Sequence, residues 1–162
     1  MGQSFSGTGE PQWLSRDERN AWLALTGLLV RLPGALDSQL ERDSHLSFFE
    51  YMVLAMLAEH QGQTLRMSAL AELTNGSLSR LSHVVRRLES QGLVRRETCQ
   101  EDRRATNAIL TDAGRERVES AAPGHVRRAR ELVVDAVAPE DLATFGKVAW
   151  QILDRVDGWQ SS

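Results

Sequence analysis

The stretch that decides the fold is residues 102–114, which read DRRATNAILTDAG. It opens with the charged turn Asp102–Arg104, and the alternating run from Ala105 to Leu110 is typical of a β-strand. Leu93 to Cys99 also has the composition of a strand, so the two runs predict a hairpin with the charged turn at its tip. Thr111 can then cap a following helix by accepting a hydrogen bond from a free main-chain N–H group.

Upstream of this hairpin, the pattern predicts two short helices around a tight turn. Met67 to Leu73 is the first helix, Thr74–Gly76 is the turn, and Ser77 caps a second helix that ends at Gly92. Two short helices joined by a three-residue turn with glycine are typical of a helix-turn-helix. The buried face of the second helix is predicted to consist of Leu78, Leu81, Val84, Val85 and Leu88.

Two more helices are predicted before the helix-turn-helix. Residues 13–42 carry an apolar stripe at helical spacing, which Pro33-Gly34 is expected to kink or interrupt. Ser47 and Glu50 match a capping box at the start of a helix that runs out at Gln61-Gly62.

Two helices also follow the hairpin. The first begins after Thr111 and is expected to be interrupted near Pro123-Gly124 before it continues through Val137. Pro139 starts the last helix at its first turn, where a missing N–H group is tolerated. Apolar residues at three- and four-residue spacing form a seam for packing on another helix, namely Leu142, Phe145, Ala149, Ile152 and Val156. The expected fold is therefore mainly α, with a small β-hairpin as the wing of a winged helix-turn-helix.

The charge distribution favours a polyanion as partner. The net charge is −3, yet residues 76–106 hold seven arginines and four acidic residues, which leaves +3 there and −6 elsewhere. A basic face on an acidic body can bind one polyanion and remain in solution. Arginine makes forked contacts to phosphates and guanine edges, although a general preference for arginine over lysine would give the same bias.

Polar and basic side chains cover the outward faces of the helix that begins after Ser77. From there they can reach base edges and phosphates in a DNA major groove. The candidates are Ser77, Ser79, Arg80, His83, Arg86 and Arg87. The alternative is a solvated basic face on an ordinary helix.

The hairpin tip supplies a second set of candidates. Arg104, with Arg103 beside it, is placed to enter a minor groove, where narrowness strengthens the negative potential. Asp102 is expected to hold the arginine side chain by a charge-assisted hydrogen bond. On its own such a turn would be an exposed ion pair worth under roughly 1 kcal/mol. Directly after a helix-turn-helix, it favours DNA contact.

These residues resemble the winged-helix signature of the MarR family of bacterial transcription regulators. The resemblance covers about residues 14–158, and it is most specific at Asp102-x-Arg104, Leu110-Thr111-x-x-Gly114 and Leu70-Ala71. It implies a homodimer built from the first and the last two helices, bound to a pseudo-palindromic operator with one recognition helix per half-site. It also implies a repressor that a small aromatic or anionic effector, or thiol oxidation, can release from DNA.

The resemblance also implies a division of the chain. Residues 1–12, rich in Gly, Ser and Gln, are expected to be a disordered arm. Residues 13–45 and 111–160 form a helical dimerisation region, and residues 46–110 form the winged helix-turn-helix that binds DNA. Arg66 stands where the family often has Ser or Thr. Since arginine is a poor N-cap, Arg66 is expected to touch a DNA phosphate.

An effector cavity beneath the dimerisation helices is a further implication. His45 and His60 bracket the helix that starts at Ser47, and both could line such a cavity. Trp22 could contribute as well, although aromatics at helical spacing are more often core residues. The histidines show no zinc-ligand spacing, so no metal and no cofactor is expected.

Cys99 is the only cysteine, so no intrachain disulfide can form and a reducing cytosol fits. A regulator that senses oxidants through Cys99 stays open as an alternative, although the family's thiol sensors carry the reactive cysteine in the first helix. The longest apolar stretch, residues 21–32, is too short to span a membrane, and the N-terminal segment lacks the pattern of a signal peptide. A cytoplasmic protein is therefore expected.

Other function classes have weaker support. No Gly-rich phosphate loop, nucleophile elbow or paired-carboxylate signature is present, so no enzyme is expected. A winged-helix module used only for protein association remains an alternative. Such a module would have no need for Arg103 and Arg104.

Overall fold

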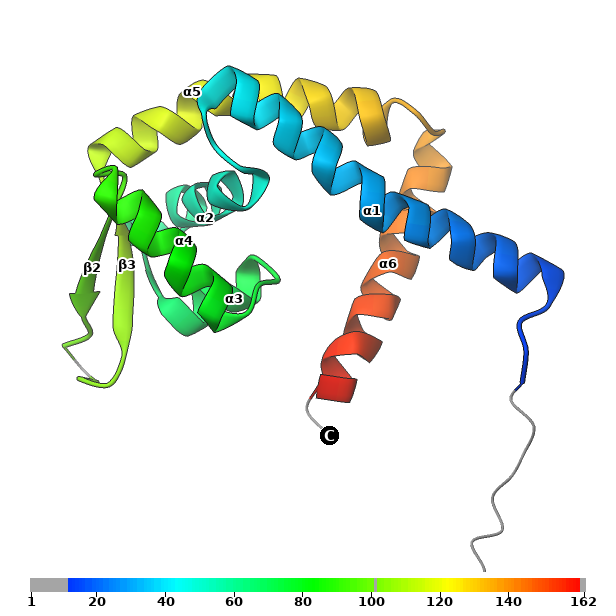
Figure 1. Ribbon diagram of the computed structural model, residues 1–162, viewed down its shortest axis with the longest axis horizontal. Coiled ribbons are helices and arrows are strands. Elements are labelled where there is room, and N and C mark those ends of the chain that lie inside the picture. The colour runs from blue at the N-terminus through cyan, green and yellow to red at the C-terminus, as the bar shows by residue number, and fades with distance from the viewer. Residues whose placement is uncertain (1–11, 101, 161–162) are drawn as a thin grey trace, which may run out of the picture. The chain divides into compact units, whose positions relative to one another are not determined.

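The computed structural model describes residues 12–100 and 102–160, and these form mostly helices with one small sheet (Figure 1). The elements are α1 (Arg16–Ser44), α2 (Phe48–Glu59), the 3-10 turn η1 (Gln61–Gln63), β1 (Thr64–Arg66), α3 (Met67–Leu73), α4 (Leu78–Ser90), β2 (Val94–Thr98), β3 (Thr106–Leu110), α5 (Asp112–Ala129), the π-helical turn η2 (Arg130–Val134) and α6 (Pro139–Gln160). Tertiary contacts divide the chain into two units, residues 1–32 and 33–162. The mainly α fold with a β-hairpin is thus confirmed.

The first unit contributes the N-terminal part of α1. The helix begins at Arg16, because the Ser15 hydroxyl accepts a hydrogen bond from the Glu18 main-chain N and the Glu18 carboxylate accepts one from the Ser15 N. The hydrogen bonds from Ser15 lower the pKa of Glu18. Trp13 and Trp22 are exposed.

The predicted arm at residues 1–12 lies, apart from Gln12, outside the described residues. Within the described ranges, no helix has the length and apolar character needed to cross a membrane.

The sheet has three antiparallel strands in the order β1-β3-β2. The predicted hairpin is confirmed, with Val94 paired to Leu110 at its base and Thr98 paired to Thr106 near its tip. The strand β1, which pairs with β3, was missing from the prediction. It has three residues, of which Leu65 alone is buried, so it is too short to show the alternation that marks a strand.

The predicted helix-turn-helix is formed by α3 and α4. In the turn, Asn75 has a φ of 51°, a conformation that asparagine tolerates better than most residues. A Cβ at Gly76 would lie 2.6 Å from the Phe49 ring, so glycine is needed for the turn to close on α2. The Ser77 hydroxyl accepts a hydrogen bond from the Arg80 main-chain N at 3.2 Å and caps α4 as predicted.

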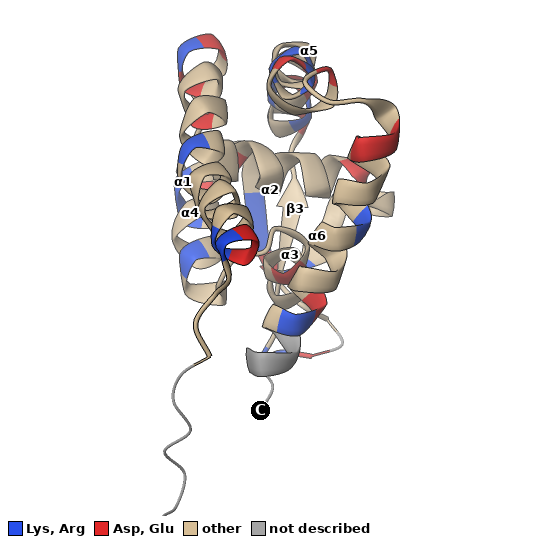
Figure 2. Cartoon of the chain, turned by 90° about the vertical axis from the view of Figure 1, so that its right-hand side faces the viewer, with Lys and Arg blue, Asp and Glu red and all other residues tan. Residues whose placement is uncertain are grey.

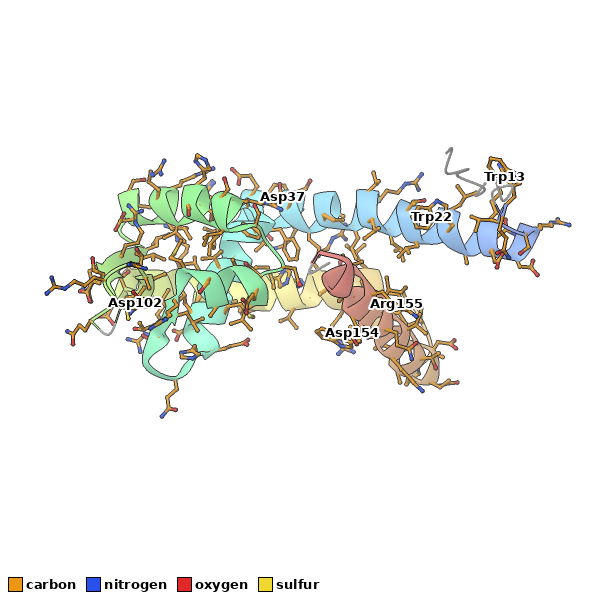
Figure 3. All side chains as sticks on the ribbon, turned by 90° about the horizontal axis from the view of Figure 1, so that it is seen from below. Trp13, Trp22, Asp37, Asp102, Asp154 and Arg155 are labelled. Carbon is orange, nitrogen blue, oxygen red and sulfur yellow. The ribbon has the colours of Figure 1, made fainter. Side chains whose placement is uncertain are left out.

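The core of the second unit is built around α2. The predicted capping box is present, because the Ser47 hydroxyl accepts from the Glu50 main-chain N and the Glu50 carboxylate accepts from the Ser47 N. From α1, the Asp37 carboxylate (Figure 3) accepts a hydrogen bond from the Phe48 N at 2.8 Å. The helix packs on α3, α4, α5 and β3. Fully buried apolar residues at these contacts include Leu54, Leu57, Leu70, Leu81, Val85, Leu88 and Ala108.

The start of α5 is fixed to the base of the hairpin. Thr111 caps the helix as predicted, accepting from the Gly114 N at 3.0 Å, and its own hydroxyl donates to the Gly92 carbonyl at 2.7 Å. The Leu93 carbonyl accepts from the Thr111 N. A Cβ at Gly114 would lie 2.0 Å from that carbonyl oxygen. The motif Leu110-Thr111-x-x-Gly114 is therefore a close contact between helix and hairpin that leaves no room for a side chain.

The interruptions predicted at the two internal prolines are wrong, while no contact or angle tests the kink that was the other possibility at Pro33. Both α1 and α5 continue through them, at Pro33 and Pro123. Each proline is exposed, so water can take the place of the missing helical hydrogen bond. The irregular segment lies further on, at the π-helical turn η2, and α6 starts at Pro139 as predicted.

Candidate nucleic-acid interface

The outward face of α4 carries three of the predicted DNA contacts. Ser79, His83 and Arg86 are exposed and lie opposite the buried positions Leu81 and Val85 on the helix. Their hydroxyl, imidazole and guanidinium groups can donate hydrogen bonds to base edges and phosphates. The face is narrow, polar and free of large apolar groups, as a helix that enters a groove requires.

The prediction that Leu78 lies on the buried face of α4 is wrong. Its side chain is 52% exposed. The reason is its place in the first turn and at the edge of that face, where it points toward the wing instead of α2. Val84, from the same predicted set, is half-buried.

Arg80 and Arg87 lie on the flank of α4 that faces α2. The Arg80 guanidinium lies 4.2 Å above the centre of the Phe49 ring, a cation–π contact. The Arg87 Nε lies 3.1 Å from a carboxylate oxygen of Glu50, whose side chain is almost fully buried while that of Arg87 is mostly exposed. The sequence predicted only DNA contacts for these two arginines. The structure gives each of them a partner on α2, so both also fix the orientation of α4.

This pairing leads to a stability prediction. Arg87→Ala is expected to lower the free energy of unfolding by about 2 kcal/mol, because it leaves the buried Glu50 carboxylate without its cationic partner. The matched control is Arg86→Ala on the same helix, which is expected to change it by less than about 0.5 kcal/mol. Urea denaturation of the free protein measures both. Equal effects of the two variants would show that Arg87 has no supporting role.

At the wing tip, Asp102 shapes the turn. Its carboxylate accepts a hydrogen bond from the Arg104 main-chain N at 3.0 Å, and its carbonyl accepts one from the Ala105 N at 2.9 Å. The predicted bond from Asp102 to an arginine side chain is therefore replaced by bonds to the main chain. Arg103 and Arg104 are exposed, and the structure, where it describes the chain, shows no ion pair to either side chain. Figure 3 labels Asp102, which lies between β2 and β3.

The end of α4 is tied to β2 by Arg96 and Glu89, a pair that the sequence did not single out. The Arg96 guanidinium donates to the Glu89 carboxylate at 2.6 and 2.8 Å, and the Arg96 main-chain N donates at 3.0 Å. These bonds lower the pKa of Glu89. In the same strand Arg95 pairs with Glu97. Together with Arg87, three arginines of the basic window are thus paired with carboxylates among the described residues.

Arg66 stands at the N-cap position of α3 and makes no side-chain capping bond there. Its Nη2 lies 3.6 Å from the Sγ of Cys99, and Cys99 is buried, with 6% of its surface exposed. A buried thiol is poorly placed to meet an oxidant. The structure therefore gives no support to the alternative of redox sensing through Cys99.

A cavity of about 340 Å³ lies where α3, α4 and the wing meet, and we call it the α4–wing cavity. Its lining combines arginines, hydroxyls and small apolar groups. The lining residues are Arg66, Met67, Ser68, Leu78, Ser82, Arg96, Arg104, Ala105 and Thr106. Arg66 and Arg104, which the sequence predicted separately, are thus brought to one place.

The effector cavity predicted from His45, His60 and Trp22 stays a prediction. His45 and His60 are both exposed and lie beyond opposite ends of α2, a helix of about 18 Å. Trp22 belongs to the other unit and is 54% exposed. The sequence did not single out His125 of α5, whose ring centre lies 4.4 Å from that of Tyr51. Burial lowers the pKa of His125.

The seam predicted on α6 is open to solvent. Phe145, Ile152 and Val156 are exposed, and Leu142 and Ala149 are half-buried. The charged residues of this helix lie mostly near its two ends (Figure 2), and Lys147 is the only one between Asp141 and Asp154. Exposed apolar side chains that recur on one helix face are typical of a surface that packs on a partner.

The comparisons with known proteins agree with this geometry. A model of the MarR family matches residues 46–105. The uncharacterized HTH-type transcriptional regulator YfiV of Bacillus subtilis (strain 168) is 30% identical over 130 residues, which cover 79% of this chain and 78% of YfiV. Among solved structures, Sco3205, a MarR family transcriptional regulator from Streptomyces coelicolor in complex with DNA, is 40% identical. It has a TM-score of 0.86, and the match covers 90% of this chain and 91% of Sco3205. AbsC, a MarR family regulator from the same organism, is 38% identical with a TM-score of 0.86, over 91% of this chain and 99% of AbsC. The chain therefore belongs to the MarR family of transcriptional regulators.

Proposed function

We propose that this protein is a homodimer that binds a pseudo-palindromic operator in double-stranded DNA and represses transcription there. Residues 46–110 form its DNA-binding region, and residues 13–45 and 111–160 form its dimerisation region. In each protomer, α4 enters the major groove and the hairpin of β2 and β3 reaches the neighbouring minor groove.

One observation carries the proposal. The outward polar face of α4 and the arginine turn of the wing lie next to each other. This follows from the α4–wing cavity, which is lined by both Ser82 of α4 and Arg104 of the wing. Two adjacent elements that present such groups fit the adjacent grooves of a duplex. Sco3205, which is 40% identical, has been crystallised with DNA. This match does not favour the alternative of a winged helix used only for protein association.

The test begins with a gel shift of the full chain on random duplex at low salt. Non-specific binding is expected there, because arginine contacts to phosphates supply most of that affinity. Selection from a random duplex pool is then expected to yield a sequence with two-fold symmetry and half-sites about 34 Å apart. Absence of any duplex binding at low salt would refute the proposal. Placing the selected sequence over a promoter in a transcription assay distinguishes repression from activation.

The wing gives a sharper prediction. Arg104→Ala is expected to weaken operator binding and to lower the slope of log affinity against log salt by about one unit. The matched control is Arg127→Ala, an exposed arginine of α5, which is expected to leave the slope unchanged. Titrations at four salt concentrations measure both slopes. An unchanged slope for Arg104→Ala would count against insertion of this side chain into a groove.

We also propose that a small aromatic or anionic effector releases the protein from DNA. This proposal rests on the family to which the chain belongs. A screen of such compounds against the operator complex tests it, with loss of the gel shift as the expected result.

A further inference from the structure

The interface between α5 and α2 contains a histidine with one unpartnered nitrogen. The ring centre of His125 lies 4.4 Å from that of Tyr51 and 5.7 Å from that of Phe48, both in α2. The Nδ1 atom of His125 is buried and has no hydrogen-bond partner in the described part of the chain. Tyr51 is also buried. Burial is the main cause that raises the pKa of its hydroxyl, so Tyr51 stays neutral over the range in which a histidine titrates.

This packing suits the neutral imidazole and not the cation. A neutral imidazole can carry its one proton on Nε2 and leave Nδ1 as a bare acceptor. The cation has a proton on both nitrogens, so Nδ1 of His125 would become a buried donor without an acceptor. Attraction between a cation and the two aromatic rings offsets part of this cost. Burial is the larger effect, because it lowers the pKa of His125 below its ordinary value of 6.5.

The charged side chains around this junction do not compensate a charge on His125. They are Asp37 and Asp43 of α1, Glu59 of α2, and Arg117 and Arg128 of α5. Asp43, for example, accepts a hydrogen bond from the Gln39 amide at 2.9 Å, and Arg128 pairs with Glu131. Among the described residues, none of these groups forms a hydrogen bond or an ion pair with the imidazole. The lowered pKa of His125 therefore has burial as its cause.

The helix that carries His125 also carries the wing. At the first turn of α5, the Thr111 hydroxyl donates to the Gly92 carbonyl at 2.7 Å, and the Leu93 carbonyl lies against Gly114. A movement of α5 against α2 therefore takes the base of the hairpin with it. We propose that His125 is an acid-sensitive switch, which holds the wing in its DNA-binding position when neutral and opens the contact between α5 and α2 when protonated. This inference rests on the proposed function.

The direction of the pH effect follows from the lowered pKa of His125. Above its ordinary value of 6.5, the side chain is neutral in the packed arrangement, in the opened one and in the unfolded chain, so a change of pH has no effect through it. As the pH falls below that value, the opened arrangement and the unfolded chain bind a proton that the packed arrangement does not. DNA binds the packed arrangement, so proton and DNA compete. Operator affinity then falls by up to about tenfold for each pH unit.

The first test needs no DNA. In NMR spectra of the full chain, the Cε1 resonance of His125 is identified by its loss in His125→Phe, which keeps an aromatic ring that cannot be protonated. This resonance is expected to titrate at lower pH than those of the exposed His45, His60 and His83. The urea midpoint of the wild type is expected to fall between about pH 7.5 and about pH 5.5, and that of His125→Phe to fall less. Titration of His125 together with the exposed histidines would refute the switch.

The second test titrates an operator, selected from a random duplex pool, over the same pH range. The slope of log affinity against pH is expected to be steeper in the wild type than in His125→Phe by up to about one unit, since one proton competes with DNA. His125→Gln, a second neutral variant, is expected to match His125→Phe, so the result does not depend on how one ring fits. The matched control His60→Phe, at an exposed histidine beyond α2, is expected to keep the wild-type slope. All four proteins retain His83, so the effect of its titration on DNA binding cancels in the comparison.

The outcomes separate the possible failures. Equal slopes in the wild type and in both His125 variants would refute the switch while DNA binding stands. If the wild type binds no duplex at any pH, the proposed function fails, and the link between His125 and the operator fails with it. The NMR titration and the urea midpoints of the free protein then still decide whether acid opens the contact between α5 and α2.

Discussion

Gly114→Ala is expected to lower the free energy of unfolding by about 3 kcal/mol, the upper part of the range for overpacked sites. The added Cβ would lie 2.0 Å from the Leu93 carbonyl oxygen and 2.8 Å from the Leu110 Cδ1. Neither neighbour can move freely. The carbonyl accepts the hydrogen bond from the Thr111 main-chain N, and Leu110 is buried at the base of the hairpin. The helix and the hairpin must therefore separate, with loss of that hydrogen bond.

The matched control is Gly34→Ala in α1. Gly34 is also helical, but a Cβ there meets no atom within 4 Å. The substitution is expected to be neutral or to stabilise by up to about 1 kcal/mol, since alanine is the better helix former. Urea denaturation followed by circular dichroism measures both variants. A loss below 1 kcal/mol in Gly114→Ala would show that the hairpin tolerates the displacement, and the role given to this glycine would be wrong.

Removal of α6 is expected to abolish the dimer. A chain that ends at Ala138 lacks the whole apolar seam from Leu142 to Val156, and with it the surface proposed to hold two DNA-binding regions at a fixed spacing. Operator affinity is then expected to fall by several orders of magnitude, because each half-site must be bound separately. Sedimentation measures the first effect, and a gel shift measures the second. A tight, folded dimer without α6 would refute the proposed interface.

A point substitution tests the same surface without removing a helix. Ile152→Glu places a charge in the exposed seam, where it would have to be buried without a partner in a dimer. The neighbouring Gln151 is exposed and lies about 100° further round the helix, so Gln151→Glu adds the same charge outside the seam. Only Ile152→Glu is expected to shift the protein to monomers at micromolar concentration. Identical sedimentation of the two variants would place the interface elsewhere.

The elements that the sequence predicted well are those marked by local chemistry. Ser47, Ser77 and Thr111 each accept a main-chain hydrogen bond at the first turn of the helix that they were predicted to cap. A cap depends on only a few neighbouring residues, so it can be recognised without knowledge of the rest of the fold. The hairpin was predictable for a similar reason, because a run with the composition or alternation of a strand on each side of a charged turn is a local pattern.

The features that were missed depend on tertiary surroundings. The three residues of β1 form a strand only because β3 lies beside them. Leu78 has the spacing of a core residue, but it faces the α4–wing cavity and stays about half exposed. Pro33 and Pro123 look like helix breaks in the sequence, yet their exposed positions let solvent compensate.

In the candidate interface, it was easier to predict which side chains are exposed than to predict which residues they contact. The exposed positions of Arg103, Arg104 and Arg86 agree with the sequence prediction, although DNA contact itself stays a prediction. No local pattern indicated that Arg87 meets Glu50 or that Arg96 meets Glu89, because each pair joins different elements. The carboxylate of Glu50 was already explained by its role in the capping box. Nothing in the sequence pattern indicated that it also pairs with an arginine.

Three consecutive residues at the start of α2 have a consequence for how the protein can be regulated. Phe49 contacts Arg80, Glu50 contacts Arg87, and the Tyr51 ring makes a tilted contact with that of His125 in α5. The first turn of α2 therefore contacts α4 through two of its side chains and α5 through a third. Since coupling between two sites is reciprocal, we expect a displacement of α5 against α2 to change the orientation of α4, and DNA bound to α4 in the proposed complex to resist that displacement to the same degree. Operator affinity is then expected to depend on buried positions that make no contact with DNA.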